Sequence, residues 1–151
     1  TADDILSGKK FPGRKIVIIG GGSVGCETAD YLAPLINDLF STNRDITLIE
    51  MTNGLMTGES GATKSLLTRR MMEKGVKIEL NSKITYVDET TIKYEKNNQE
   101  CVLNDVDTLV FAVGYQPISS PIENAHLIGD CQKVGTLKDA ISQAYQITKE
   151  I

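Results

Sequence analysis

The feature that most constrains this chain is a stretch near its start, Lys15–Glu27, which reads KIVIIGGGSVGCE. Ile16 to Ile19 form an unbroken apolar run, which is typical of a parallel strand covered on both faces. Glycines follow with the spacing G-x-G-x-x-G, at Gly20, Gly22 and Gly25. The stretch therefore predicts a buried strand, a tight turn and the first residues of a helix.

Each glycine of such a turn has its own physical role. The first permits the tight turn, the second lets the backbone approach a pyrophosphate, and the third lets the helix pack against the strand. The amides of the first helical residues, which include Ser23 and Val24, and the helix dipole would hold the phosphates. The pattern alone is weak evidence for nucleotide binding, so the rest of the chain has to support it.

A second apolar strand, predicted at 45–50, ends at Glu50. A carboxylate in this position can accept two hydrogen bonds from an adenosine ribose, and it repels a 2′-phosphate. Glu50 lies 25 positions after Gly25, more than the usual separation of about 20, and an extension at 34–43 accounts for the excess. Because Met51 and the two residues after it include no arginine, NAD(H) is favoured over NADP(H). The alternative is a solvated glutamate at a strand end.

The remaining pattern predicts an α/β fold: a Rossmann-like parallel sheet with helices on both faces and an antiparallel three-stranded β-meander as crossover. Pro34 should end or kink the first helix, because its ring and missing N–H disrupt a helix interior. The second helix is expected to turn Leu66, Leu67 and Met71 toward the core. The predicted elements are a helical turn at 3–6, helices at 24–32, 35–40, 62–74 and 137–149, parallel strands at 16–19, 45–50, 76–80 and 107–113, meander strands at 83–87, 91–95 and 101–103, and a short strand at 126–128.

Composition argues against several classes of protein. The net charge is −4 and no basic stripe is present, so no nucleic-acid partner is expected. No apolar run reaches the roughly 18 residues of a membrane span. Three widely spaced cysteines without a C-x-x-C motif, and a single histidine, His126, argue against a metal site and fit the reducing cytoplasm. The first residue is Thr1 rather than Met, so we expect a piece of a longer protein.

Several motifs, taken together and in order, resemble a known family. They are KIVIIGGGSVGCETADYL at 15–32, DITLIEM at 45–51, the meander, DTLVFAVGYQP at 107–117 and AHLIGDC at 125–131. The chain resembles the pyridine-nucleotide-disulfide-oxidoreductase-like flavoproteins, in which an NAD(P)H domain is inserted into an FAD domain. Among them it is similar above all to the C-terminal NAD(P)H-binding region of the NADH:flavin oxidoreductase, 2,4-dienoyl-CoA reductase and 2-enoate reductase group.

The resemblance implies a role for each matching residue near the glycine turn. The three turn glycines would bind the NADH pyrophosphate, and Glu50, with Met51 beside it, the adenosine ribose. Glu27 would lie toward the nicotinamide. The alternative is a purely structural role, in which Glu27 complements the helix dipole from the first turn.

The resemblance also assigns residues in the last third of the chain. Ala112, Val113 and Gly114 would form the strand-end segment that returns the chain to the FAD domain. Gly129 and Asp130 would match the motif whose aspartate binds the FAD ribitol. Without the resemblance, Asp130 would be taken as a helix or turn cap. No side chain is expected to act as a catalytic acid or base.

The domains implied are an entering linker at 1–14, an NAD(H)-binding Rossmann-like domain at 15–115 and a remnant of an FAD-binding domain at 116–151. The parent would be an enoate or dienoyl-CoA reductase-like or NADH oxidase-like enzyme that passes hydride from NADH to a flavin. The family's FAD domain needs a glycine motif of its own and this chain has only one, so the FAD site is incomplete here. The position of Gly129 and Asp130 argues against the one motif being that of FAD.

Partners and cofactors follow from the same resemblance. NAD(H) would bind to this chain, whereas FAD, an FMN and an iron–sulfur cluster would be completed or held by the parent. The partners would be the dinucleotide and the missing FAD and TIM-barrel portions of the parent, and this chain alone would be inactive. The alternative is a non-catalytic module that binds ADP or NAD.

Overall fold

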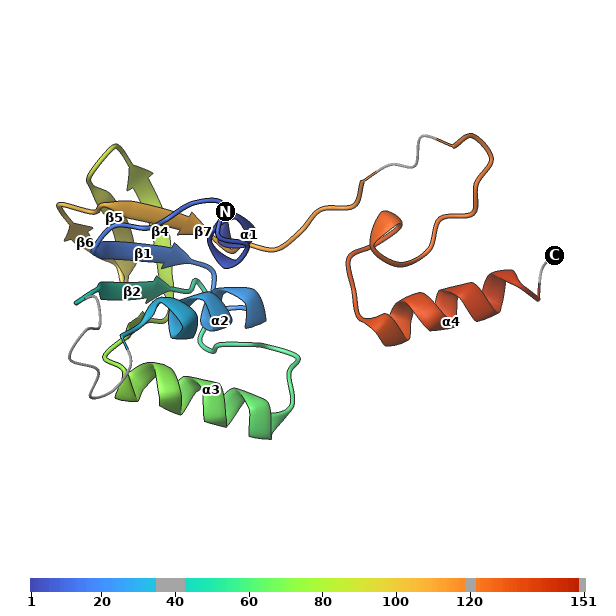
Figure 1. Cartoon of the computed structure of the whole chain (residues 1–151), viewed down its shortest axis with the longest axis horizontal. Coiled ribbons are helices and arrows are strands. Elements are labelled where there is room, and N and C mark those ends of the chain that lie inside the picture. The colour runs from blue at the N-terminus through green and yellow to red at the C-terminus, as the bar shows by residue number, and fades with distance from the viewer. Residues whose placement is uncertain (35–42, 119–121, 150–151) are drawn as a thin grey trace. The chain divides into compact units, whose positions relative to one another are not determined.

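The computed structural model describes residues 1–34, 43–118 and 122–149 (Figure 1). The chain divides into two compact units, Thr1–Val113 and Gly114–Ile151. The division falls after Val113, where the sequence suggested a domain boundary after residue 115. The predicted helical segment at 35–40 lies outside the described residues.

The centre of the first unit is a four-stranded parallel sheet with the strand order β3-β2-β1-β7. β1 lies inside the sheet, where Ile18 is opposite Leu48 on one side and Val110 on the other. These three side chains are at most 1% exposed. The predicted parallel sheet of unbroken apolar strands is therefore confirmed. The strands are β1 (Lys15–Ile19), β2 (Asp45–Ile49), β3 (Lys77–Glu79) and β7 (Thr108–Phe111).

One face of this sheet packs against helices. The first core cluster combines residues of β1 and β2 with residues of α2 (Ser23–Leu32) such as Cys26 and Ala29. α2 ends at Leu32, and Ala33 is extended (φ −66°, ψ 142°). The cause is Pro34, because a residue that precedes proline is driven out of the helical region. The helix end predicted from Pro34 is confirmed.

α3 (Gly61–Glu73) lies on the same side and contacts α2. Met71 is fully buried and Leu67 packs against the first cluster, as predicted. Leu66, however, is 50% exposed, so its predicted place in the core is wrong. Successive residues of a helix point about 100° apart, and here Leu67 faces the core while Leu66 points away from it.

The predicted meander is confirmed as a second, antiparallel sheet with the order β4-β5-β6. It covers the other face of the parallel sheet, where Ile92 and Tyr94 of β5 pack with Val17 and Ile49. The sequence predicted helices on both faces, and the described residues place the meander on this one. The reason is the alternation of side chains along a strand, which turns Val17 and Ile49 away from the helices. The strands are β4 (Ser82–Val87), β5 (Ile92–Lys96) and β6 (Gln99–Leu103).

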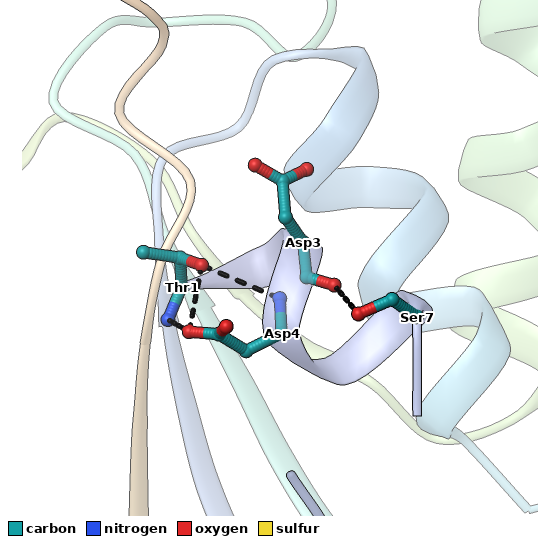
Figure 2. A network of polar contacts seen from close by, with 4 residues as sticks. All are labelled: Thr1, Asp3, Asp4 and Ser7. Atoms are coloured by element: carbon teal, nitrogen blue, oxygen red, sulfur yellow. Dashed lines mark hydrogen bonds and ion pairs between the residues drawn. The ribbon is translucent and has the colours of Figure 1, made fainter. Parts of the chain in front are cut away.

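A short helix, α1 (Ala2–Leu6), begins the chain with a capping box (Figure 2). The Thr1 hydroxyl accepts a hydrogen bond from the Asp4 amide at 3.3 Å, and the Asp4 carboxylate accepts one from the Thr1 nitrogen at 3.1 Å. At the other end the Ser7 hydroxyl donates to the carbonyl oxygen of Asp3 at 2.6 Å. Ala2 and Ile5 belong to the first core cluster. The helical turn predicted here is present, and it packs into the core of the first unit.

In its described residues, the second unit contains a 3-10 turn, η1 (Gly129–Cys131), and one helix, α4 (Leu137–Ile147). None of its residues within 114–118 and 122–149 is buried. The helix is confirmed, but the strand predicted at 126–128 is absent. Ile128 is extended (φ −136°, ψ 163°), yet no described strand of this unit lies beside it to complete a ladder.

Candidate functional site

The carboxyl ends of three neighbouring strands bring together the segments that the sequence singled out. The Gly20 amide donates to the carbonyl oxygen of Ile49 at 2.9 Å, and the Ala112 amide donates to that of Ile19 at 2.9 Å. The glycine turn, the end of β2 and the end of β7 therefore lie at one edge of the sheet. In open α/β sheets this edge, outside the carboxyl ends of the strands, is where ligands bind.

Two of the three motif glycines are required by the fold itself. Gly20 has φ +109°, and a Cβ atom there would lie 2.4 Å from the carbonyl oxygen of Ala112. A Cβ atom at Gly25 would lie 1.9 Å from the carbonyl oxygen of Gly20. Any larger residue at either position would push the turn, β7 and α2 apart. These contacts place Ala112, which is half-buried, directly against the turn.

Gly22 is different, because nothing in the protein requires a glycine there. Its backbone is ordinary (φ −70°, ψ 179°), and no atom lies within 4 Å of the place a Cβ atom would take. The space above it is open. A glycine that neither strain nor crowding demands fits a position where another molecule approaches the backbone.

Gly22 is also the N-cap residue of α2, and it offers no side-chain cap. The amide of Cys26 donates to the carbonyl oxygen of Gly22 at 3.0 Å, so the first intrahelical bond is in place. The amides before it, at Ser23, Val24 and Gly25, belong to the positive end of a ten-residue helix. The open space and the uncapped amides together fit an anion such as a pyrophosphate.

Glu50 lies directly after β2 and its carboxylate is held by the backbone. Oε2 accepts a hydrogen bond from the Gly21 amide at 2.6 Å, and Oε1 accepts one from the Thr52 amide at 2.7 Å. Partial burial raises the pKa of this carboxyl, but hydrogen bonds from Gly21, Thr52 and Met51 together outweigh burial and hold the pKa below its usual value. Glu50 is therefore ionised and fixed in place at neutral pH.

The loop from β2 to α3 folds back onto the glycine turn, which the sequence analysis did not foresee. Leu55 and Met56 are 4% and 2% exposed, and the Met56 amide donates to the carbonyl oxygen of Gly21 at 2.7 Å. Further along, the Ser23 hydroxyl donates to Oε1 of Glu59 at 2.7 Å. The available signal was the apolar Leu-Met pair inside an otherwise polar, glycine-rich loop.

Other predicted site residues near this edge are exposed. Glu27 lies in the second turn of α2, because the helix begins at Ser23 and its first turn contains no acidic residue. Its predicted place in the first turn is wrong, and a dipole role for it is weak because that effect falls off within the first turn. Met51 and Val113 are 70% and 69% exposed.

Gly114, Gly129 and Asp130 belong to the second unit. Gly114 has φ +95° and Gly129 has φ +59°, and the Gly129 amide donates to Oε1 of Gln143 at 2.6 Å. Asp130 is exposed, and its Oδ1 accepts a hydrogen bond from the Gly135 amide at 3.1 Å. This contact joins η1 to the residue before the N-cap of α4.

The start of α4 contrasts with that of α2. Thr136 and Asp139 form a capping box, in which the Thr136 hydroxyl accepts from the Asp139 amide at 3.3 Å and the Asp139 carboxylate accepts from the Thr136 amide at 2.8 Å. Hydrogen bonds of this kind satisfy the helix end from within.

The cysteines are free thiols at separate places in the fold. Cys26 is buried in α2, and burial, together with the nearby Glu50 and Glu27 carboxylates, raises its pKa to about 12. It is therefore a neutral core thiol. Within the described ranges, no three His, Cys, Asp or Glu side chains are grouped as a metal site requires. No helix in the part of the chain that the structure describes has the length and apolarity needed to cross a membrane.

A parallel sheet with a glycine turn after one strand and an acidic residue at the end of the next defines an α/β unit of the Rossmann type. Comparison with known proteins narrows this class. Residues 1–144 match the pyridine nucleotide-disulphide oxidoreductase family, and the chain belongs to that family. Its members are oxidoreductases that use FAD and NAD(P).

Individual relatives are several times longer than this chain. It is 30% identical over its whole length to the cinnamate reductase of Clostridium sporogenes, of which it spans 23%. It is 23% identical over 98% of its length to the NADH oxidase of Thermoanaerobacter brockii, and it spans 23% of that protein too. A solved 2-naphthoyl-CoA reductase, bound to 2-naphthoyl-CoA, matches 99% of the chain with a TM-score of 0.78 and 23% identity, over 23% of its own length. This last likeness supports the fold.

Proposed function

We propose that the first unit is the NADH-binding domain of a larger FAD-dependent oxidoreductase. The observation that carries the proposal is the pairing, at one edge of the sheet, of an open, uncapped helix start at Gly22 with an ionised carboxylate at Glu50. The first suits a pyrophosphate and the second suits a ribose.

The pyrophosphate is assigned to the start of α2. The amides of Ser23, Val24 and Gly25 have no side-chain cap before them, and the helix dipole favours an anion there. The open space above Gly22 lets a ligand reach the backbone. Gly20 keeps the turn in the shape that this approach requires.

The adenosine ribose is assigned to Glu50. Each carboxylate oxygen accepts one backbone amide and can accept a further bond, so both oxygens can receive ribose hydroxyls. The same negative charge repels a 2′-phosphate, so the site favours NADH over NADPH. Met51 is exposed directly after Glu50 and is assigned to the same end of the nucleotide.

The remaining assignments rest on the family resemblance. Exposed Glu27 on α2 is assigned to the nicotinamide end, and Ala112, Val113 and Gly114 to the segment that leads out of the domain. When bound, NADH supplies a hydride, which a flavin accepts in the parent. The residues of this chain bind and orient the dinucleotide, and none is assigned as a catalytic acid or base.

The second unit is proposed to be a remnant of the FAD-binding domain, with Gly129 and Asp130 on the flavin side. Its lack of a buried residue within 114–118 and 122–149 supports a segment that packs against parts of a longer protein. The chain spans about a quarter of its relatives, so FAD, an FMN, an iron–sulfur cluster and a TIM-barrel portion are assigned to the parent.

The parent is proposed to be an enoate or dienoyl-CoA reductase-like enzyme, or an NADH oxidase-like one. A cinnamate reductase and an NADH oxidase among the relatives support these two possibilities. The free thiols fit a cytoplasmic location, and this chain alone is expected to catalyse no turnover.

A second candidate is a non-catalytic module that binds ADP or NAD. It is favoured by the fact that the residues assigned to the ADP half, the glycine turn and Glu50, all lie in the first unit. Comparing the affinities for ADP and NADH separates a reductase domain from a module that binds ADP. A reductase domain gains affinity from the nicotinamide end, and a simple ADP-binding module does not.

Calorimetric titration of the purified chain with NADH, NADPH and ADP tests the assignment. We expect NADH to bind more tightly than NADPH, and Glu50→Ala to weaken NADH binding by about 10- to 100-fold. The expected loss corresponds to about 1.5–3 kcal/mol, the contribution of one hydrogen bond to a charged group. NADPH binding should weaken less than NADH binding, so the ratio of the two affinities should fall.

The matched control is Glu89→Ala, which removes an exposed carboxylate from the turn between β4 and β5. The neighbouring Thr90 accepts a hydrogen bond from Val106, just before β7, so this turn lies toward the amino ends of the parallel strands. The control should leave both affinities unchanged. Equal affinity of the wild-type chain for NADH and NADPH would contradict the role of Glu50.

A further inference from the structure

The contact between Ser23 and Glu59 places a negative charge at the start of α2. Ser23 is the first residue of this helix, and its hydroxyl donates to Oε1 of Glu59 at 2.7 Å. Glu59 is exposed, and it forms no ion pair with a lysine or arginine of the described ranges. A carboxylate thus lies beside the same helix end that the proposed function assigns to a pyrophosphate.

The position of Glu59 is set by the loop that carries it. Met56 is tied to the glycine turn by its hydrogen bond to Gly21, and the Glu59 amide donates to the carbonyl oxygen of Met56 at 3.1 Å. On the other side, Ser60 is the N-cap of α3. The backbone of Glu59 is therefore fixed on both sides, and its carboxylate is within hydrogen-bond reach of Ser23.

We propose that Glu59 is an internal competitor for the phosphate site: its carboxylate, which accepts a hydrogen bond from the Ser23 hydroxyl, lies beside the α2 helix start and opposes the binding of an anionic nucleotide. This inference rests on the proposed function and deepens it. Anions are favoured at a helix N-terminus, so the Glu59 carboxylate and a pyrophosphate compete for the same positive end. Binding of the nucleotide requires Glu59 to leave Ser23 or to remain as a repelling neighbour.

The competition has a consequence for specificity. Repulsion grows with the charge of the ligand, so Glu59 disfavours NADPH more than NADH, in the same direction as Glu50. An uncharged nucleoside has no phosphate charge, so Glu59 does not oppose its binding. Repulsion between exposed charges is screened by salt, so the effect of Glu59 should fade as ionic strength rises.

The test is calorimetric titration of the whole chain with NADH, NADPH and adenosine for the wild type, Glu59→Gln and the control Glu89→Gln. Glutamine keeps an oxygen that can accept from Ser23 and loses only the charge. We expect Glu59→Gln to bind NADH about three- to tenfold more tightly at low salt, with a larger gain for NADPH and none for adenosine. The NADH gain should shrink in about 0.5 M salt, and Glu89→Gln should match the wild type.

The outcomes separate the two proposals. Wild-type binding of NADH with no gain in Glu59→Gln, or an equal gain for adenosine, overturns the role of Glu59 and leaves the NADH site standing. Weaker binding in Glu59→Gln also overturns it, because Glu59 would then be a ligand of the nucleotide. If neither the wild type nor a variant binds NADH, the proposed function fails and the role of Glu59 fails with it.

Discussion

The two units of this chain differ in how their apolar residues are used. In the first unit, two core clusters cover both faces of the parallel sheet, and residues such as Ile18 and Leu48 are fully buried. In α4 of the second unit, Leu137, Ile141 and Tyr145 are 78%, 60% and 63% exposed. These three residues are spaced four apart, so they share one face of the helix. The first unit has a core of its own, and the second presents the face on which a core could form.

The two helix starts show the same contrast in polar groups. α4 begins with the Thr136–Asp139 capping box, which satisfies its amides from within. α2 begins at Gly22 without a side-chain cap. Glycine in place of a good N-cap typically costs only a few tenths of a kcal/mol, so the uncapped start is a small cost to the fold. The first unit, which contains the two core clusters, is therefore also the unit whose helix α2 starts without a side-chain cap. An anion-binding site at the end of a helix requires such an uncapped start.

The largest expected difference between the two units is in the free energy of unfolding lost when an apolar side chain is truncated. Leu48→Ala should lower the free energy of unfolding of the first unit by about 3 kcal/mol, because Leu48 is fully buried and truncation leaves a cavity. Ile141→Ala in α4 should change it by less than about 0.5 kcal/mol. Urea unfolding followed by circular dichroism measures both. Similar losses in the two variants would show that α4 packs into a core of this chain.

A smaller effect concerns Glu50 and pH. Its pKa lies below the ordinary value of 4.5, so its ionised form stabilises the folded state above that pH, and this stability is lost as the pH falls through the lowered pKa. At pH 7, Glu50→Gln should be less stable than the wild type by about 1 kcal/mol, a modest figure because the group is partly solvated. Near pH 3 the difference should shrink.

Its counterpart in the second unit is Asp139, whose pKa is lowered by its hydrogen bonds to Thr136. Asp139→Asn should leave the unfolding of the first unit unchanged at either pH. Urea unfolding of the wild type, Glu50→Gln and Asp139→Asn at pH 3 and pH 7 measures these differences in stability. A deficit of Glu50→Gln that is the same at pH 3 and pH 7 would contradict a stabilising carboxylate.

Local patterns predicted the first unit well because its strands are unbroken β-branched and leucine runs and its turn is marked by glycines. The steric roles of Gly20 and Gly25 follow from the motif, and the structure adds the atoms involved. The meander was predictable because short alternating segments are separated by residues suited to tight turns, and Asn97 and Asn98 both have positive φ.

Features that depend on a distant partner could not be predicted. The segment 126–128 is apolar and extended, but a strand also needs a neighbour, which sequence alone does not supply. Leu66 and Leu67 are equally apolar, and only packing decides which one faces the core. The Glu59 contact joins residues 36 positions apart in sequence through a loop whose path is set by the burial of Leu55 and Met56.

The central claim is that the open space above Gly22 is kept for the pyrophosphate of NADH. Gly22→Ala tests it most directly, with Gly61→Ala as control, because a Cβ atom at Gly61, the first residue of α3, also meets open space. Both variants should unfold within about 1 kcal/mol of the wild type. Calorimetric titration should show at least about a tenfold loss of NADH affinity in Gly22→Ala alone. Unchanged affinity in Gly22→Ala would contradict the account.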